Sequence, residues 1–297
     1  MTEGPNRVFT KAMSSPVLQL SCPAKINLHL RVLGKREDGF HALDTRLCPL
    51  DLSDTLSFSE ASATPRISQL TCSDASLPTD ETNLVMKALR AFEKATGTPQ
   101  SWNLHLEKRI PHGAGLGGGS SNAAMTLRGL NLLSGHPLSQ ETLVTLGSQL
   151  GSDVPFFLYD AVCDATGRGE VLTPLDFPWQ LPVVLIKPPF GIPTPWAYKQ
   201  WSTSTQLHGV LYAPQLCPWG PMVNDLERPV FEKWSLLPAL KMWLLDQVET
   251  RAALMSGSGS TVFAVAQSET DAAALATKAA AHCGETTWVK VVRAGHP

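Results

Sequence analysis

The chain has 297 residues, of which 43% are hydrophobic and 17% are charged. At ~150 residues per domain this length predicts about two domains, and the composition excludes a disordered tail or a small disulfide-stapled protein. The net charge of −2 lacks the basic excess that binding to a phosphate backbone requires, so no nucleic-acid partner is expected.

The cysteines and the apolar runs indicate a cytoplasmic protein that does not enter a membrane. Six cysteines are scattered without a C-x-x-C pair or a metal-ligand spacing, which is typical of free thiols in a reducing compartment. The longest apolar runs are far shorter than the ~20 residues that cross a bilayer. Residues 1–15 lack the apolar core of a signal peptide, so we expect a frayed extension, with Met13 as an alternative start.

The first half of the chain predicts a β-rich opening followed by a helix and a strand. Residues 21–59 read as short strands and turns, because apolar residues alternate with polar ones and glycines punctuate the pattern. Apolar residues recur every fourth position over 82–96, which predicts a helix that Gly97 ends. Residues 102–106 alternate between apolar and polar and predict a strand before Pro111.

A glycine-rich loop over 111–121 is the most informative segment. It has five glycines in the seven positions 113–119 and leads into a helix with a buried apolar face. A second helix is expected over 139–150, and a Gly-Ser-Asp-Val-Pro turn over 151–155 follows it.

The second half predicts a smaller domain of helices on a sheet. Three prolines between 174 and 182 mark a domain boundary near Asp176. Strands are expected over 183–187, 261–266 and 288–292, helices over 237–248 and 270–283, and a Trp- and Pro-rich loop that lines a pocket over 191–221. The fold class is therefore α+β, with domains over 1–176 and 177–297 and the active site between them.

The glycine loop predicts a phosphate site. Glycine loses more backbone entropy on folding than other residues, so this many glycines indicate that bare backbone is needed. Free N–H groups at a helix N-terminus bind phosphate, although a flexible linker or a tight turn is the alternative. The loop matches the dinucleotide fingerprint. That fold, however, needs a second strand after the first helix, and here one predicted helix follows another up to residue 150. It has no Walker lysine, and the protein kinase motifs are absent.

Three segments together carry a resemblance to a known family. They are Pro-Ala-Lys-Ile-Asn-Leu over 23–28, the loop over 111–121, and Met-Ser-Gly-Ser-Gly-Ser over 255–260. The sequence resembles the GHMP kinase superfamily from about residue 22 to 265. Four more motifs, over 34–41, 151–155, 191–194 and 224–227, are similar to those of the family that phosphorylates 4-diphosphocytidyl-2-C-methyl-D-erythritol.

The resemblance implies a fold, a reaction and a set of site residues. The fold would be a ribosomal protein S5 domain 2-like N-terminal domain and a ferredoxin-like α/β sandwich at the C-terminus. The reaction would transfer the γ-phosphate of ATP to the substrate 2-hydroxyl in the non-mevalonate route to isoprenoid precursors. The implied catalytic residues are Lys25 and Asp153. The implied ATP-binding residues are Pro111, His112, Gly113, Ala114, Gly115, Leu116, Gly117, Gly118, Gly119, Ser120, Ser121, Asn83 and Lys108. The implied substrate-binding residues are Asn27, Phe40, His41, Thr194 and Tyr198.

Several of these residues also have an ordinary structural explanation. Asp153 in its turn is also typical of an Asx-turn, and Lys25, His41, Asn83 and Lys108 are residue types that usually face solvent. No acidic residue lies between 122 and 133, so no protein ligand for a metal is expected, and Mg²⁺ would be held mainly by ATP and water.

Three rival functions remain at this point. They are a GHMP kinase for mevalonate, homoserine or a sugar, a non-catalytic nucleotide-binding module, and a Rossmann oxidoreductase. The expected partners are ATP and a small molecule, and the oligomeric state is either a monomer or a homodimer.

Overall fold

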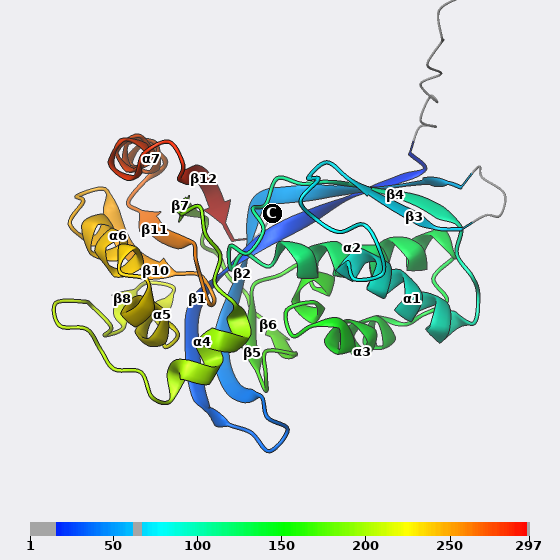
Figure 1. Ribbon diagram of the computed structural model, residues 1–297, viewed down its shortest axis with the longest axis horizontal. Helices are drawn as coiled ribbons and strands as arrows, with labels where there is room; N and C mark the ends of the chain where they lie inside the picture. The colour runs from blue at the N-terminus through cyan, green and yellow to red at the C-terminus, as the bar shows by residue number, and fades with distance from the viewer. Residues whose placement is uncertain (1–15, 62–66, 296–297) are drawn as a thin grey trace, which may run out of the picture.

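The structure is a computed structural model that describes residues 16–61 and 67–295. The expectation about residues 1–15 therefore lies outside the described residues. Two long antiparallel strands, β1 (Leu18–Lys35) and β2 (His41–Glu60), form the spine of the molecule (Figure 1). The prediction of short strands over 21–59 was wrong, because register shifts such as the one between Pro23 and Lys25 absorb the breaks without ending the pairing.

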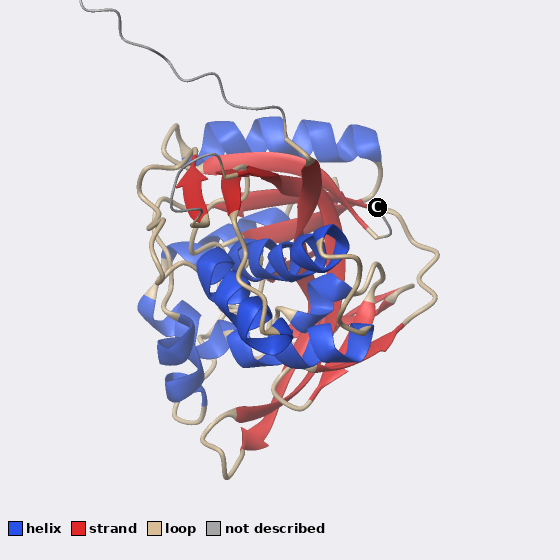
Figure 2. Ribbon diagram, turned by 90° about the vertical axis from the view of Figure 1, so that its right-hand side faces the viewer, coloured by secondary structure: helices blue, strands red, loops and turns tan. Residues whose placement is uncertain are grey.

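The N-terminal sheet grows on β2. The strand pairs with β4 (Trp102–Glu107) and β5 (Cys163–Thr166), while β3 (Gln69–Cys72) pairs with β4 and β6 (Val171–Pro174) pairs with β5. Three helices cover one face of this sheet: α1 (Leu84–Thr96), α2 (Gly118–Leu133) and α3 (Gln140–Leu150). Figure 2, viewed from the end that carries them, shows the helices in front of the curved strands.

The predicted helix ends in this half are confirmed by their caps. Asn83 accepts the Val85 N–H at the start of α1, and Gly97 ends it with φ +67°. Ser139 accepts the Thr142 N–H at the start of α3. A short 3₁₀ helix, η1 (Pro155–Leu158), follows the turn after α3 and packs against α2 and α3.

The C-terminal sheet has the order β10-β11-β7-β12, all antiparallel. Its strands are β7 (Leu181–Lys187), β10 (Thr250–Met255), β11 (Val262–Ala266) and β12 (Trp288–Ala294). The helices α5 (Glu227–Lys233), α6 (Leu236–Leu245) and α7 (Glu269–Cys283) accompany it (Figure 1). The predicted helix over 237–248 overran, because the chain turns after Asp246 to enter β10.

The expected loop over 191–221 is partly regular structure. It contains α4 (Thr194–Trp201), β8 (Gln215–Cys217) and the start of β9 (Gly220–Asn224). Pro195 lies in the first turn of α4, where a missing N–H costs nothing, so the proline that suggested a loop starts a helix instead.

The two halves share one sheet. Ala294 of β12 pairs with Leu50 of β2, and β9 pairs with β1 on the other side. β6 pairs within the N-terminal sheet and β7 within the C-terminal sheet, so the pairing changes between residues 174 and 181. The domain boundary at 176 stays a prediction.

Candidate active site

The glycine loop between β4 and α2 is held to the body of the protein by its carbonyl groups. Leu116 O accepts the Lys25 N–H at 2.9 Å, and Ala114 O accepts the Thr261 N–H at 3.2 Å. The side chains of Ala114 and Leu116 are buried in the core. Within the part of the chain that the structure describes, the N–H groups over 115–119 donate to no protein acceptor. These amides are free to bind an anion, and the N-terminus of α2 adds its dipole.

Positive φ angles shape this loop. Gly113, Gly115 and Gly117 have φ +64°, +74° and +72°. A Cβ on Gly117 would lie 2.9 Å from Lys25 Cγ and 2.8 Å from Phe157 Cζ. Glycine is therefore required at 117 both for its conformation and for the close approach of Lys25.

Lys25 lies under the loop, next to Asp153. Lys25 is 3% exposed, and its Nζ donates to Asn27 Oδ1 at 2.7 Å and lies 3.4 Å from Asp153 Oδ2. Asn27 in turn donates to Thr45 Oγ1 at 2.9 Å, which fixes the amide orientation. The Asp153 side chain is 38% exposed, on the turn between α3 and η1. The structure thus brings Lys25, Asn27 and Asp153 together, and neither Lys25 nor Asn27 faces solvent.

A second glycine loop, over 255–260, reaches this group from the C-terminal half. Ser256 Oγ donates to Gly115 O at 2.9 Å, which joins the two loops directly. A Cβ on Gly257 would lie 3.4 Å from Lys25 Nζ. Ser258 Oγ lies 2.8 Å from Thr194 Oγ1 at the start of α4. Thr194 is therefore part of the same surface as the catalytic candidates.

Aromatic residues gather beside Asp153. The rings of His41 and Tyr198 stack with centroids 5.4 Å apart, and Trp201 meets His41 edge-on at 6.1 Å. Burial, with a smaller effect of Lys35, lowers the pKa of His41, so its ring is neutral at pH 7. Burial and then the nearby Asp153 carboxylate raise the pKa of the Tyr198 hydroxyl.

Phe40 stands apart from this stack at the tip of the β1–β2 hairpin. Its ring is 48% exposed, and the Arg168 guanidinium lies over it at 4.9 Å. The structure therefore joins His41 and Tyr198 but places Phe40 against Arg168.

A buried polar cluster anchors the segment that leads into the loop. Asp54 is fully buried and accepts the N–H groups of Arg109 and Ile110 at 2.7 and 2.9 Å, and it pairs with Lys108 Nζ. Asn122 Nδ2 also donates to Asp54, at 2.9 Å. Lys108 is thus engaged by a carboxylate rather than free. Sequence reasoning missed Asp54, although a carboxylate at an even position among the buried Leu52, Leu56 and Phe58 of one strand face is a readable signal.

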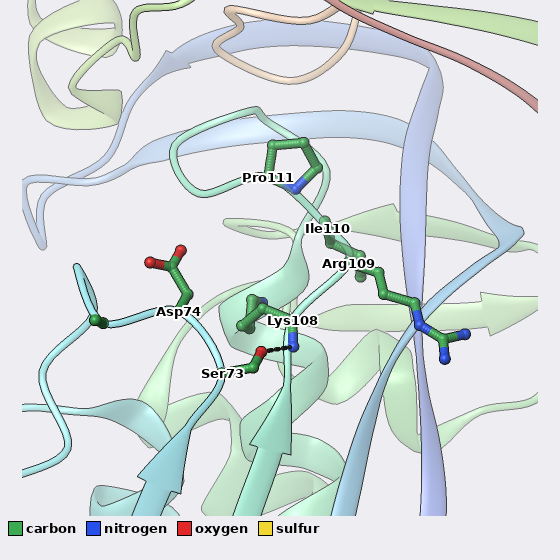
Figure 3. Close-up of a pocket in the computed structure, with 7 residues that line it drawn as sticks. Ser73, Asp74, Lys108, Arg109, Ile110 and Pro111 are labelled. Atoms are coloured by element: carbon green, nitrogen blue, oxygen red, sulfur yellow. Dashed lines mark hydrogen bonds between the residues drawn. The ribbon is translucent and has the colours of Figure 1, made fainter.

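A cavity of about 420 Å³ opens beside this cluster. It is lined by Ser73, Asp74, Ala75, Lys108, Arg109, Ile110 and Pro111, and Ser73 Oγ accepts the Lys108 N–H at 2.8 Å (Figure 3). The cavity adjoins the first residue of the glycine loop, so a nucleotide with phosphates on the loop has room for its base here.

The remaining predicted nucleotide residues have mixed placements. His112, Gly113 and Gly119 are exposed, and Ser120 is half-buried. Ser121 is fully buried, and its hydroxyl has no hydrogen-bond partner among the described residues. The Asn83 side chain caps α1 and donates to Pro78 O at 2.6 Å, and it is not among the lining residues of the cavity.

Two further features bear on ligands and membranes. Among residues 16–61 and 67–295, no three or more His, Cys, Asp or Glu side chains are grouped to hold a metal ion. No helix in those ranges has the length and apolar character needed to cross a membrane.

Comparison with known proteins identifies the family. The model of the GHMP kinases N terminal domain matches residues 83–161, and that of the GHMP kinases C terminal matches residues 237–285. The 4-diphosphocytidyl-2-C-methyl-D-erythritol kinase of Methylacidiphilum infernorum is 40% identical over 272 residues, 91% of this chain and 94% of that one. The enzyme of the same name from Protochlamydia amoebophila is 42% identical over 85% of each chain.

Solved structures agree. A crystal structure of 4-(cytidine 5'-diphospho)-2C-methyl-D-erythritol kinase has a TM-score of 0.77 and 34% identity, and the match covers 94% of this chain and all of that one. A homoserine kinase from Cytophaga hutchinsonii shares the fold, with a TM-score of 0.68 at 18% identity over 97% of this chain and 98% of its own. The predicted two-domain fold and the assignment as a kinase that uses ATP are confirmed. The chain belongs to the GHMP kinases and, within them, to the family of the 4-diphosphocytidyl-2-C-methyl-D-erythritol kinases.

Proposed function

We propose that this kinase transfers the γ-phosphate of ATP to the 2-hydroxyl of 4-diphosphocytidyl-2-C-methyl-D-erythritol, giving the 2-phosphate and ADP on the non-mevalonate route to isoprenoid precursors. The observation that carries the proposal is the 3.4 Å approach of Lys25 Nζ to Asp153 Oδ2 beneath a loop with free amide groups. A cation, a carboxylate and an anion site at one point are what transfer of a phosphoryl group to an alcohol requires.

Each residue has a distinct part in this reaction. The hydroxyl oxygen forms a bond to the γ-phosphorus, the bond from that phosphorus to the bridging oxygen of ADP breaks, and Asp153 accepts the hydroxyl proton. Lys25 offsets the negative charge on the hydroxyl oxygen and on the transferred group. Asn27 holds Lys25 in place through its 2.7 Å hydrogen bond.

The phosphates of ATP lie on the amides over 115–119, with the base in the cavity beside Lys108 and Pro111. The Mg²⁺ that accompanies ATP neutralises phosphate charge and is held mainly by the phosphates and water. Two observations support this: the first turn of α2 has no acidic residue, and the lone pairs of Asp54 are already engaged. We also keep Asn83, at the N-terminus of α1, as a nucleotide contact.

The cytidyl end of the substrate lies against the aromatic residues. Tyr198 and Phe40 offer ring faces to the cytosine, and the neutral His41 offers a hydrogen bond to its edge. Thr194, beside Ser258, contacts the diphosphate or erythritol part. We place the protein in the cytoplasm as a monomer or homodimer, with domains over 1–176 and 177–297.

The test is release of ADP from Mg-ATP in parallel reactions with the cytidyl substrate, mevalonate, homoserine, galactose or no acceptor. Turnover with the cytidyl substrate alone supports the proposal. Turnover with another acceptor alone keeps the phosphate site and refutes the substrate, whereas no turnover in any reaction favours a non-catalytic nucleotide-binding module.

Variants then test the two catalytic assignments. Asp153→Asn and Lys25→Met should fold and bind ATP but lose kcat by roughly three orders of magnitude or more. Turnover near the wild-type level in either variant refutes the role of that residue.

A further inference from the structure

A buried ion pair lies behind the second glycine loop, away from the reacting groups. Glu227 at the start of α5 and Lys241 on α6 are each 1% exposed, and Lys241 Nζ donates to Glu227 Oε2 at 2.6 Å. Lys241 Nζ also donates to Leu211 O at 2.6 Å. The other carboxylate oxygen, Glu227 Oε1, accepts the N–H of Met255 at 2.9 Å.

Met255 is the first residue of the loop over 255–260, so Glu227 fixes the point at which this loop leaves β10. Asn224, three residues before Glu227, fixes the same loop further along. Its Nδ2 donates to Met255 O and Gly257 O, both at 2.7 Å, and its Oδ1 accepts the Leu226 N–H. We refer to Asn224, Glu227 and Lys241 together as the loop brace.

The loop that the brace holds touches the reaction site at three points. They are the Ser256 bond to Gly115, the approach of Gly257 to Lys25, and the Ser258 contact with Thr194. None of these points is in the cavity that we assign to the base of ATP. A shift of the loop would therefore disturb phosphoryl transfer more than nucleotide affinity.

An ion pair is a costly way to hold a backbone amide in a dry interior. Replacing such a pair with apolar residues often leaves stability unchanged or improves it, so stability alone does not explain why a charge is there. Glu227 Oε1 is, however, the acceptor of the buried Met255 N–H at 2.9 Å, and Lys241 compensates the charge of that carboxylate. The Glu227–Lys241 pair therefore fixes the position of the loop over 255–260, in addition to any effect on stability.

We propose that the loop brace is a positioning device for phosphoryl transfer, which holds the loop over 255–260 against the phosphate loop and Lys25. This inference rests on the proposed function. The brace residues are buried, so they act through the loop rather than by contact with ATP or the acceptor.

Two matched double variants test it. Glu227→Gln with Lys241→Met removes both charges but keeps an acceptor for the Met255 N–H, whereas Glu227→Met with Lys241→Met removes the acceptor as well. If the brace positions the loop, the Gln double variant keeps kcat within about threefold, and the Met double variant loses about tenfold or more in kcat with the KM for ATP within about threefold. Equal kcat in the two folded variants overturns the proposal.

Hydrogen exchange of the 255–260 segment is a readout that needs no turnover. Exchange at Met255 should be faster in the Met double variant and unchanged in the Gln double variant, even if the acceptor of the kinase is another alcohol. If the wild-type protein shows no turnover, the proposed function is refuted and the brace is not. If Met255 exchanges equally fast in both double variants, the brace is refuted and the proposed function is not.

A third variant covers the case in which the Met double variant does not fold. Asn224→Ala leaves the ion pair intact and frees two carbonyls of the same loop. It should lower kcat about tenfold with unchanged KM for ATP, and a wild-type kcat in this variant overturns the proposal.

Discussion

Gly115 is the position at which a single methyl group should separate the two glycine loops. A Cβ there would lie 2.3 Å from Ser256 O and 2.9 Å from Gly259 O. Both contacts are backbone atoms, so no side chain can rotate away, and the loop over 255–260 must move by about 1 Å to reach ordinary contact. Gly115→Ala therefore tests whether the approach of the loops matters for the reaction.

Gly113→Ala is the matched control. Gly113 has φ +64° and Gly115 has φ +74°, so alanine pays a similar penalty of about 1–2 kcal/mol for the left-handed conformation at both positions. The nearest atom to a Cβ at 113 is Gly191 Cα at 3.6 Å, an ordinary contact. The difference between the two variants isolates the collision, for which overpacking predicts about 1–3 kcal/mol more destabilisation at 115.

Urea unfolding and ADP release measure the two effects. A displacement of about 1 Å near reacting groups can lower kcat by about 10²-fold, so Gly115→Ala should be far slower than Gly113→Ala when both are folded. If the two variants unfold at the same urea concentration and turn over at the same rate, the contact between the loops has no energetic or catalytic role and the reasoning fails.

Three other perturbations follow from the described contacts. Burial and Lys35 lower the pKa of His41, so the folded state favours the neutral ring. KM for the cytidyl substrate should therefore stay flat from pH 8 to about 6.5 and rise below that pH, where the free energy of unfolding should also fall. A rise in KM already above pH 7 contradicts this expectation. Asp54→Asn leaves the buried Lys108 without its counter-charge and should lower the free energy of unfolding by about 3–5 kcal/mol in urea; a loss below about 1 kcal/mol refutes the anchoring role. Ser139→Ala removes the cap of α3 and should cost about 1 kcal/mol with kcat unchanged, while Ser139→Asp restores stability; a changed kcat would show that the cap is coupled to Asp153.

Local patterns in the sequence were enough for most helices and for the family. Asn83 and Ser139 stand where caps are needed, and Gly97 stands where a helix must end, so these boundaries follow from interactions within a few residues. The length of β1 and β2 was not predictable in this way. Bulges near Pro23 keep two strands paired across residues that look like breaks, and only the partner strand shows that the pairing continues.

The site residues likewise fall into those that the sequence identified and those that only the tertiary structure revealed. The glycine content over 113–119 and the motif around Lys25 determine by themselves that backbone amides and a cation are available, because those properties belong to the residues. That Lys25 lies 3.4 Å from Asp153, that Ser256 closes on Gly115, and that Lys108 is bound by Asp54 instead of being free were decided by the tertiary structure. These pairs are separated by 54 to 141 residues in the chain, and their distances depend on how strands and loops pack, which no local pattern encodes.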